Sequence, residues 1–212
     1  MVFRMLKLVQ GRGASSPSLH PICLPIICML ALGASPSNSQ LVQFFQEEIQ
    51  IQVLGGSCIL TGVYHFRNVT AEPVAQELFY PFPARKDLPS PTEVEARELT
   101  TGVRLPAKRV PRGATFSLFL PPRGEVVCSV SYVQPTPAGR MEYPLISTQH
   151  WGRPLEHATY AVIVPDGYVL HALSIPADTT WNSSSTLTYM SRKVNFMPTR
   201  DLTFRWEKRI RR

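Results

Sequence analysis

The sequence lacks the short motifs by which common enzyme classes are identified. It has no Gly-x-Ser-x-Gly nucleophile motif and no glycine-rich phosphate loop leading into a helix. Its five histidines lie apart from one another, without the tight spacing of zinc motifs. Heptads and internal repeats are also absent, which excludes coiled coils and repeat architectures. We therefore expect no cofactor, no metal ion and no catalytic residue.

Acidic residues are absent from residues 1–39, where three basic residues precede an apolar run of 11 residues, Ile22–Leu32. Small residues follow at Ala31–Ala34 and Ser37–Ser39, as a signal peptidase requires. The run is shorter than the ~20 apolar residues that cross a membrane as a helix. We therefore predict a signal peptide with its cleavage region at 1–39, and a product that is secreted, periplasmic or on the cell surface. A retained signal anchor is the alternative.

Removing this segment lowers the positive charge of the chain. The whole sequence carries 22 basic and 15 acidic residues, a net charge of +7. Residues 1–39 hold three of the basic residues and no acid, so 19 and 15 remain, a net charge of +4. Because part of the basicity belongs to the signal, charge is weak evidence for nucleic-acid binding, and we expect no nucleic-acid partner.

Four cysteines are present, of which Cys23 and Cys28 fall in the signal and Cys58 and Cys128 remain. An even pair in an exported chain favours a disulfide. Both residues also fall on the apolar faces of expected strands. A Cys58–Cys128 bridge would close a loop of about 71 residues and contribute on the order of 4 kcal/mol to stability. Two buried free thiols are the alternative.

Apolar and polar residues alternate with a period of two through most of residues 40–212, as in Ile49–Val53, and prolines and glycines separate the runs. Half-polar alternation is typical of antiparallel sheets that bury one face. The sequence therefore predicts an all-β fold, an antiparallel β-sandwich of roughly ten short strands, with a subdivision near residue 140 left open. The expected strands are 49–53, 58–67, 74–80, 93–99, 103–110, 114–120, 126–132, 158–164, 168–173, 186–192 and 202–207.

Part of the chain resembles a known module. Phe66–Asn68, then Glu72–Val74 and Leu78–Pro83, read like the start of the VIT (vault/inter-alpha-trypsin) domain. Leu120–Val126 and Ser131–Tyr132 are similar to its later proline-glycine turn and strand. The resemblance extends to related exported bacterial β-sandwich proteins. The metal-binding von Willebrand A domain that often follows a VIT domain is not found in this sequence. It implies a role in protein interaction or assembly rather than catalysis.

The loop Gln149–Pro154 combines His150, Trp151 and Arg153, residue types that often anchor interfaces. We predict these three as binding residues. The alternative for Trp151 is a side chain that closes the mouth of the core. The basic end could make weak contact with an anionic surface. Its candidate residues are Lys208, Arg209, Arg211 and Arg212.

These features favour a secreted or envelope-associated, non-catalytic β-sandwich that binds a protein or glycan at the cell envelope. The rival hypothesis is an exported hydrolase or metal-assisted enzyme with a site assembled by the fold around residues 147–157. Its first candidates are His150, Glu156 and His157, which flank one turn.

Overall fold

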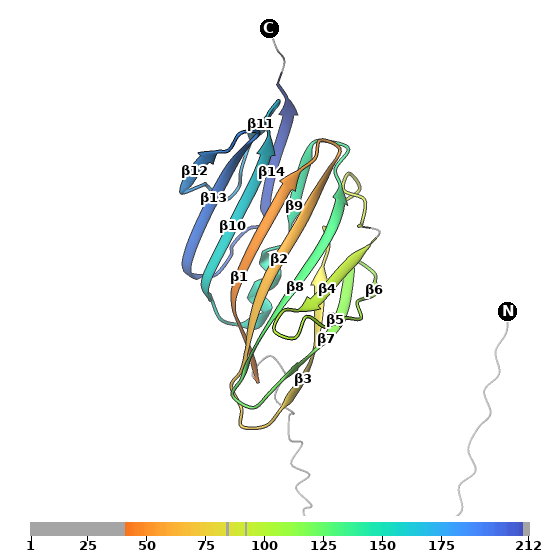
Figure 1. The fold of residues 1–212 in the computed structure, drawn as a ribbon, viewed down its shortest axis with the longest axis vertical. Coiled ribbons are helices and arrows are strands. Elements are labelled where there is room, and N and C mark those ends of the chain that lie inside the picture. The colour runs from red at the N-terminus through yellow and green to blue at the C-terminus, as the bar shows by residue number, and fades with distance from the viewer. Residues whose placement is uncertain (1–40, 84, 92, 210–212) are drawn as a thin grey trace, which may run out of the picture. The chain divides into compact units, whose positions relative to one another are not determined.

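The computed structural model describes residues 41–83, 85–91 and 93–209. The predicted signal peptide at 1–39 lies outside them. The described residues form fourteen strands and one short 3-10 helix (Figure 1). None of these segments is a helix long and apolar enough to cross a membrane. The elements are β1 (Val42–Val53), β2 (Ser57–Asn68), β3 (Val74–Pro81), β4 (Val94–Glu98), β5 (Arg104–Leu105), β6 (Lys108–Val110), β7 (Gly113–Leu120), β8 (Glu125–Pro135), β9 (Arg140–Tyr143), η2 (Ile146–Trp151), β10 (Leu155–Pro165), β11 (Tyr168–His171), β12 (Thr179–Asn182), β13 (Thr186–Phe196) and β14 (Leu202–Lys208).

The strands form two layers with a shared apolar core, which confirms the predicted all-β sandwich. One layer is an eight-stranded sheet in the order β12-β13-β10-β1-β2-β8-β4-β5. The other consists of two three-stranded sheets, β11-β14-β9 and β3-β7-β6, which Figure 1 shows behind the large sheet. The second layer is therefore interrupted, and β3 and β9 are each an edge of their own sheet.

The period of two predicted the buried faces of β2 and β8 correctly. In β2 every second residue from Cys58 to Asn68 is buried, and β8 shows the same pattern from Val126 to Gln134. Every expected run contains a strand, but 103–110 forms two. Pro106 and Ala107 separate β5, which pairs with β4 in the large sheet, from β6, which pairs with β7 in the second layer. Proline cannot donate to a strand ladder, so the chain crosses between layers at this point. The expected set omitted β9 and β12.

One strand pair departs from the expected antiparallel arrangement. β1 pairs antiparallel with β2 but parallel with β10, in a register that joins Ile49 to Tyr160 and Ile51 to Val162. Strands from beyond residue 140 thus belong to the same sheet as β1 and β2. On the far side of β10, β13 and β12 continue the sheet with antiparallel pairs.

The predicted Cys58–Cys128 disulfide is wrong: both cysteines are free and buried. They lie on the neighbouring strands β2 and β8, where Cys58 faces Gln134 and Cys128 faces Tyr64. That register sets them six residues apart along the strands, about 20 Å. A disulfide needs Cα atoms within about 7 Å, so no small adjustment could join them. Burial raises the pKa of each thiol to about 12.

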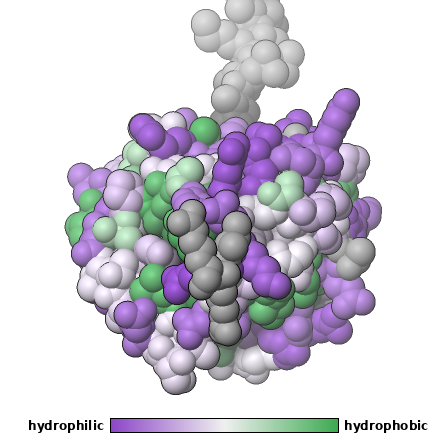
Figure 2. Space-filling model, turned by 90° about the horizontal axis from the view of Figure 1, so that it is seen from above, coloured by the Kyte–Doolittle hydropathy of each residue, from purple (hydrophilic) through white to green (hydrophobic). Residues whose placement is uncertain are grey.

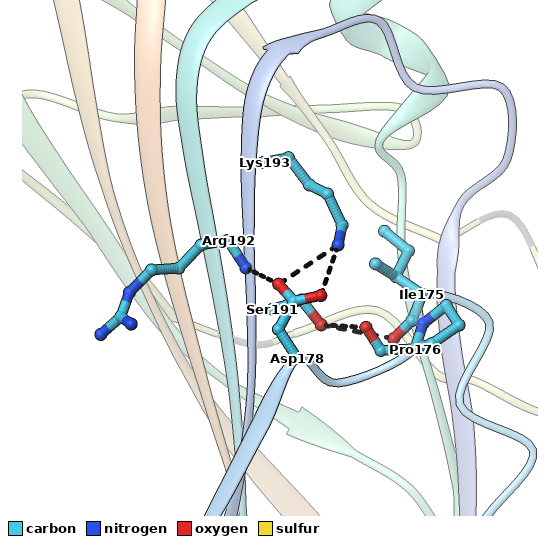
Figure 3. A network of polar contacts seen from close by, with 6 residues as sticks. All are labelled: Ile175, Pro176, Asp178, Ser191, Arg192 and Lys193. Atoms are coloured by element: carbon cyan, nitrogen blue, oxygen red, sulfur yellow. Dashed lines mark hydrogen bonds and ion pairs between the residues drawn. The ribbon is translucent and has the colours of Figure 1, made fainter.

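The connection from β11 to β12 is held against β13 by polar contacts (Figure 3). The Asp178 carboxylate accepts hydrogen bonds from the Arg192 backbone N–H at 2.6 Å and from Lys193 Nζ at 2.9 Å. Ser191 Oγ donates to the carbonyl oxygen of Pro176 at 2.7 Å. All three contacts use donor atoms of β13, and Ile175 of the same connection is buried in the core, so polar and apolar contacts together fix the course of this segment.

Candidate functional site

A cavity of about 70 Å³ lies where the second layer is interrupted. Its walls come from β3 and β7 on one side and from β9 and η2 on the other, and its floor comes from β1, β2 and β8. We call this interruption, with its cavity, the seam. Phe79 lines the cavity and is 55% exposed, so the cavity reaches the molecular surface there.

A glutamate, Glu47, forms part of the cavity floor and is only 1% exposed. Its inward position follows from the period of two in β1, because Glu47 shares a face with Ile49 and Ile51. The strand register shifts between Phe44 and Gln46, so the buried inner positions continue at Phe44 rather than at Phe45. This bulge places an aromatic ring beside Glu47 on the inner face of the sheet.

Tyrosine hydroxyls from four other strands connect to Glu47. Tyr160 of β10 donates to Oε1 of Glu47 at 2.6 Å, and Tyr143 of β9 donates to Oε2 at 3.4 Å. The Tyr143 hydroxyl also lies 3.0 Å from that of Tyr64 in β2, which donates to the Tyr80 hydroxyl in β3 at 2.9 Å. The chain of hydroxyls therefore crosses the seam from β9 to β3.

Burial controls the ionisation of this network. It raises the pKa of Glu47 to about 7, although the hydrogen bonds from Tyr160 and Tyr143 act in the opposite direction. Burial also raises the pKa values of Tyr64, Tyr80, Tyr143 and Tyr160, so all four remain protonated hydrogen-bond donors near neutral pH. Glu47 is the member of the network whose charge changes near neutrality.

Aromatic rings close the cavity at the η2 end. The Trp151 ring lies 5.8 Å from that of Phe44 and 5.5 Å from that of Phe66, measured between centroids. Trp151 is half-buried against the core, which matches the alternative that it closes the mouth of the core. Its neighbours in the predicted binding loop, His150 and Arg153, are exposed. The His150 Nδ1 lies 3.0 Å from the carbonyl oxygen of Ser147.

The predicted basic end lies away from this loop. Lys208 and Arg209 are exposed at the end of β14, while Arg211 and Arg212 fall outside the described residues. In β14, Leu202 faces Tyr143 of β9, whereas Lys208 pairs with β11. Lys208 follows Leu202 by six strand residues, so the two residues lie about 20 Å apart. Figure 2 views the molecule from this end and shows mainly hydrophilic residues with small hydrophobic patches between them. The structure thus separates the two parts of the predicted binding surface.

Glu156, a candidate of the rival enzyme hypothesis, is bound to other side chains. Glu156 accepts from Arg67 at 3.3 Å and from Gln43 at 3.3 Å, and it lies with His157 on the exposed start of β10. Across the described ranges, no group of three or more His, Cys, Asp or Glu residues could hold a metal ion.

Sequence reasoning missed Glu47 and its tyrosines. The sequence did contain an indication of a buried Glu47, because the alternation that begins at Ile49 extends back to Glu47 on the same apolar face. An acid at an inward position is rare unless it has a specific partner or function. Tyr64 lies on the same face of β2 as Cys58, but which tyrosines meet Glu47 depends on which strands become neighbours.

Comparison with known proteins identifies the fold but no family. No protein-family model matches the sequence, and no curated protein matches it either. The crystal structure of a candidate nutrient-binding protein from Legionella pneumophila is similar, with a TM-score of 0.63 and 14% identity over 78% of this chain and 67% of that one. Two M1 zinc metallopeptidase structures, one of them from Deinococcus radiodurans, give TM-scores of 0.49 at 12% and 11% identity. These matches cover 78% of this chain, which spans less than half of each peptidase (42% and 43%).

Proposed function

We propose that this chain is an exported, non-catalytic β-sandwich that binds a macromolecular partner, a protein or a glycan, outside the cytoplasm, and that the seam is its contact site. The acid-free, apolar front end supports export. The similarity in fold to a candidate nutrient-binding protein supports a binding role. The resemblance to the VIT domain supports interaction or assembly as the purpose of that binding.

The seam carries this proposal because it is a preformed hollow in an otherwise continuous layer. Binding sites are typically concave and apolar, with a few convergent polar groups. The cavity has this composition, with Phe44, Phe66 and Trp151 among its apolar lining and Glu47 with tyrosine hydroxyls as polar groups. Exposed Phe79 at its opening offers a partner an apolar contact beside the hollow.

The nucleophiles at the seam are not activated, which supports binding rather than catalysis. The Cys128 thiol lines the cavity, but burial raises its pKa to about 12, so the thiol remains protonated and unreactive. Ser147 Oγ donates to the carbonyl oxygen of Pro144 at 2.7 Å. The neighbouring His150 ring contacts the backbone of Ser147 rather than its hydroxyl, so this pair lacks the nucleophile–base hydrogen bond.

The test compares two phenylalanines of the same exposed sheet face. Phe79 lines the cavity, whereas Phe119, which is 67% exposed on the neighbouring β7, does not. The immobilised protein is presented with extracellular proteins of the source and with a glycan panel, and Phe79→Asp is compared with Phe119→Asp. We expect Phe79→Asp to abolish partner binding and Phe119→Asp to leave it unchanged.

The predicted loop supplies a second arm of this experiment. His150→Ala combined with Arg153→Ala removes two exposed side chains beside Trp151 without changing the cavity walls. We expect this pair to weaken binding about tenfold if the partner extends over η2, since rim contacts contribute less than central ones. Binding that tolerates all of these variants would place the contact site elsewhere and overturn the proposal.

A further inference from the structure

The chemical character of the cavity is set by an unbalanced charge. Its fifteen lining residues include Glu47 but no lysine, arginine or histidine. Glu47 receives hydrogen bonds from two neutral tyrosines and no ion pair from the described residues. Buried carboxylates are normally paired with a cation or with several hydrogen-bond donors, because the isolated charge is costly in an apolar interior. Above about pH 7, where Glu47 is mostly ionised, a positive charge is the group that would balance it.

The aromatic rings that line the cavity suit a cation, as Glu47 does. The rings of Phe44, Phe66 and Trp151 surround one end of the cavity, and the faces of aromatic rings attract cations within about 6 Å of the centroid. The methylene groups of an amine would contact the same rings. The volume of the cavity limits the size of the ligand. Each atom of about the size of a water molecule needs about 10–15 Å³, so about 70 Å³ admits roughly five non-hydrogen atoms.

We infer that the seam cavity binds an alkylammonium group of about four or five heavy atoms, with its nitrogen at Glu47 and its methylenes against the aromatic rings. The inference rests on the proposed function, because it assigns the group that a partner inserts into the seam. Two sources present this chemistry. One is a free small amine, and the other is the side chain of a lysine on a protein partner.

The charge of Glu47 gives this ligand a specific pH dependence. The groups that face Glu47 are Tyr64 of β2, Tyr143 of β9 and Tyr160 of β10, and all three remain neutral because their pKa values are raised. With the pKa of Glu47 at about 7, its ionised fraction rises from roughly 0.1 at pH 6 to roughly 0.9 at pH 8. An alkylammonium ion stays charged over this range, so its affinity should rise about tenfold.

The probes are butylammonium chloride and its neutral counterpart 1-butanol, titrated into the wild-type protein at pH 6 and pH 8 and followed by NMR shifts of cavity residues. We expect butylammonium to bind about tenfold more tightly at pH 8, and 1-butanol to bind more weakly without that gain. Equal affinity for the two probes, or no binding of butylammonium, would overturn the inference. This experiment needs only the unmodified protein.

Variants test the assigned residue. Glu47→Gln keeps the shape of the side chain and should lower butylammonium affinity at pH 8 at least tenfold and remove its pH dependence. Glu48→Gln is the matched control, because Glu48 is exposed on the opposite face of β1. An unchanged affinity in Glu47→Gln, with folding verified by thermal unfolding, contradicts the inference.

Two further comparisons separate the sources and the two proposals. Tighter binding of Nα-acetyl-lysine methylamide than of butylammonium identifies a lysine of a protein partner, and the reverse order identifies a free amine. If Phe79→Asp abolishes partner binding while no amine binds, the ammonium assignment fails and the seam remains the contact site. If neither partner nor amine responds to changes at the seam, both proposals fail together.

Discussion

Glu47 should make the stability of this protein fall as the pH rises toward neutrality. Its pKa is about 7 in the folded chain and 4.5 for the unperturbed side chain, so the folded state binds more protons than the unfolded state between these values. The favourable contribution is complete below about pH 4.5 and is lost as the pH passes through about 7. At 1.36 kcal/mol per pH unit, the loss is about 3 kcal/mol.

Replacing Glu47 with glutamine isolates this contribution, because the amide mimics the protonated acid without titrating. The amide oxygen can accept from Tyr160, and the amide nitrogen can donate to Tyr143, whose hydroxyl then donates to Tyr64. We expect Glu47→Gln to be within about 1 kcal/mol of wild type at pH 5 and about 2–3 kcal/mol more stable at pH 8.5.

Urea unfolding measured at intervals from pH 5 to pH 8.5 gives the comparison. With a slope of roughly 2 kcal/mol per molar urea, the expected difference at pH 8.5 shifts the midpoint by about 1–1.5 M. Glu77→Gln, at an exposed residue of β3, should keep the wild-type pH profile. Parallel profiles for wild type and Glu47→Gln would refute the claim that burial of this carboxyl raises its pKa.

Other residues yield predictions that need simpler measurements. Cys58 and Cys128 should both react with a thiol reagent in denaturant, and neither should react in the native protein. Reduction should leave the intact mass unchanged, and a mass increase of about two hydrogens on reduction would contradict the strand register. Trp151→Ala should lower the free energy of unfolding by about 2–3 kcal/mol because it removes a ring packed on two others, whereas Trp181→Ala, at a 44% exposed side chain, should change it by less than about 0.5 kcal/mol in the same denaturation assay. Asp178→Ala should speed hydrogen exchange in the connection before β12, and unchanged exchange there would show that this carboxylate does not hold the segment.

The parts of the fold that depend on local pattern could be predicted from the sequence, and the parts that depend on distant strands could not. Cys58 and Cys128 were placed on inward faces correctly, because the period of two is a local property. Whether they meet depends on the register between β2 and β8, which many cross-strand pairs set together. The sequence therefore predicted burial of the thiols but not the distance between them.

The candidate site was hidden for the same reason. Glu47 and Tyr160 are 113 residues apart and meet only because β1 pairs with β10. The sequence pattern drew attention instead to Trp151, His150 and Arg153, which are close in sequence. Of these, Trp151 does reach the cavity, but as a wall built on Phe44 and Phe66. The sequence therefore predicted a residue next to the cavity, Trp151, but Glu47 and its tyrosines could be identified only from the three-dimensional structure.

The parallel pair between β1 and β10 has a consequence for how the chain folds. β10 begins at Leu155, about 100 residues after β1 ends at Val53, so closing this pair requires a large loss of chain entropy before any contact compensates for it. A chain that emerges from its N-terminal end can form the β1–β2 hairpin early, but the other edge of β1 stays unpaired until β10 is present. Unpaired strand edges recruit other chains. We therefore expect β10 to protect this edge of β1 once it pairs, and chains that lack β10 to aggregate more readily.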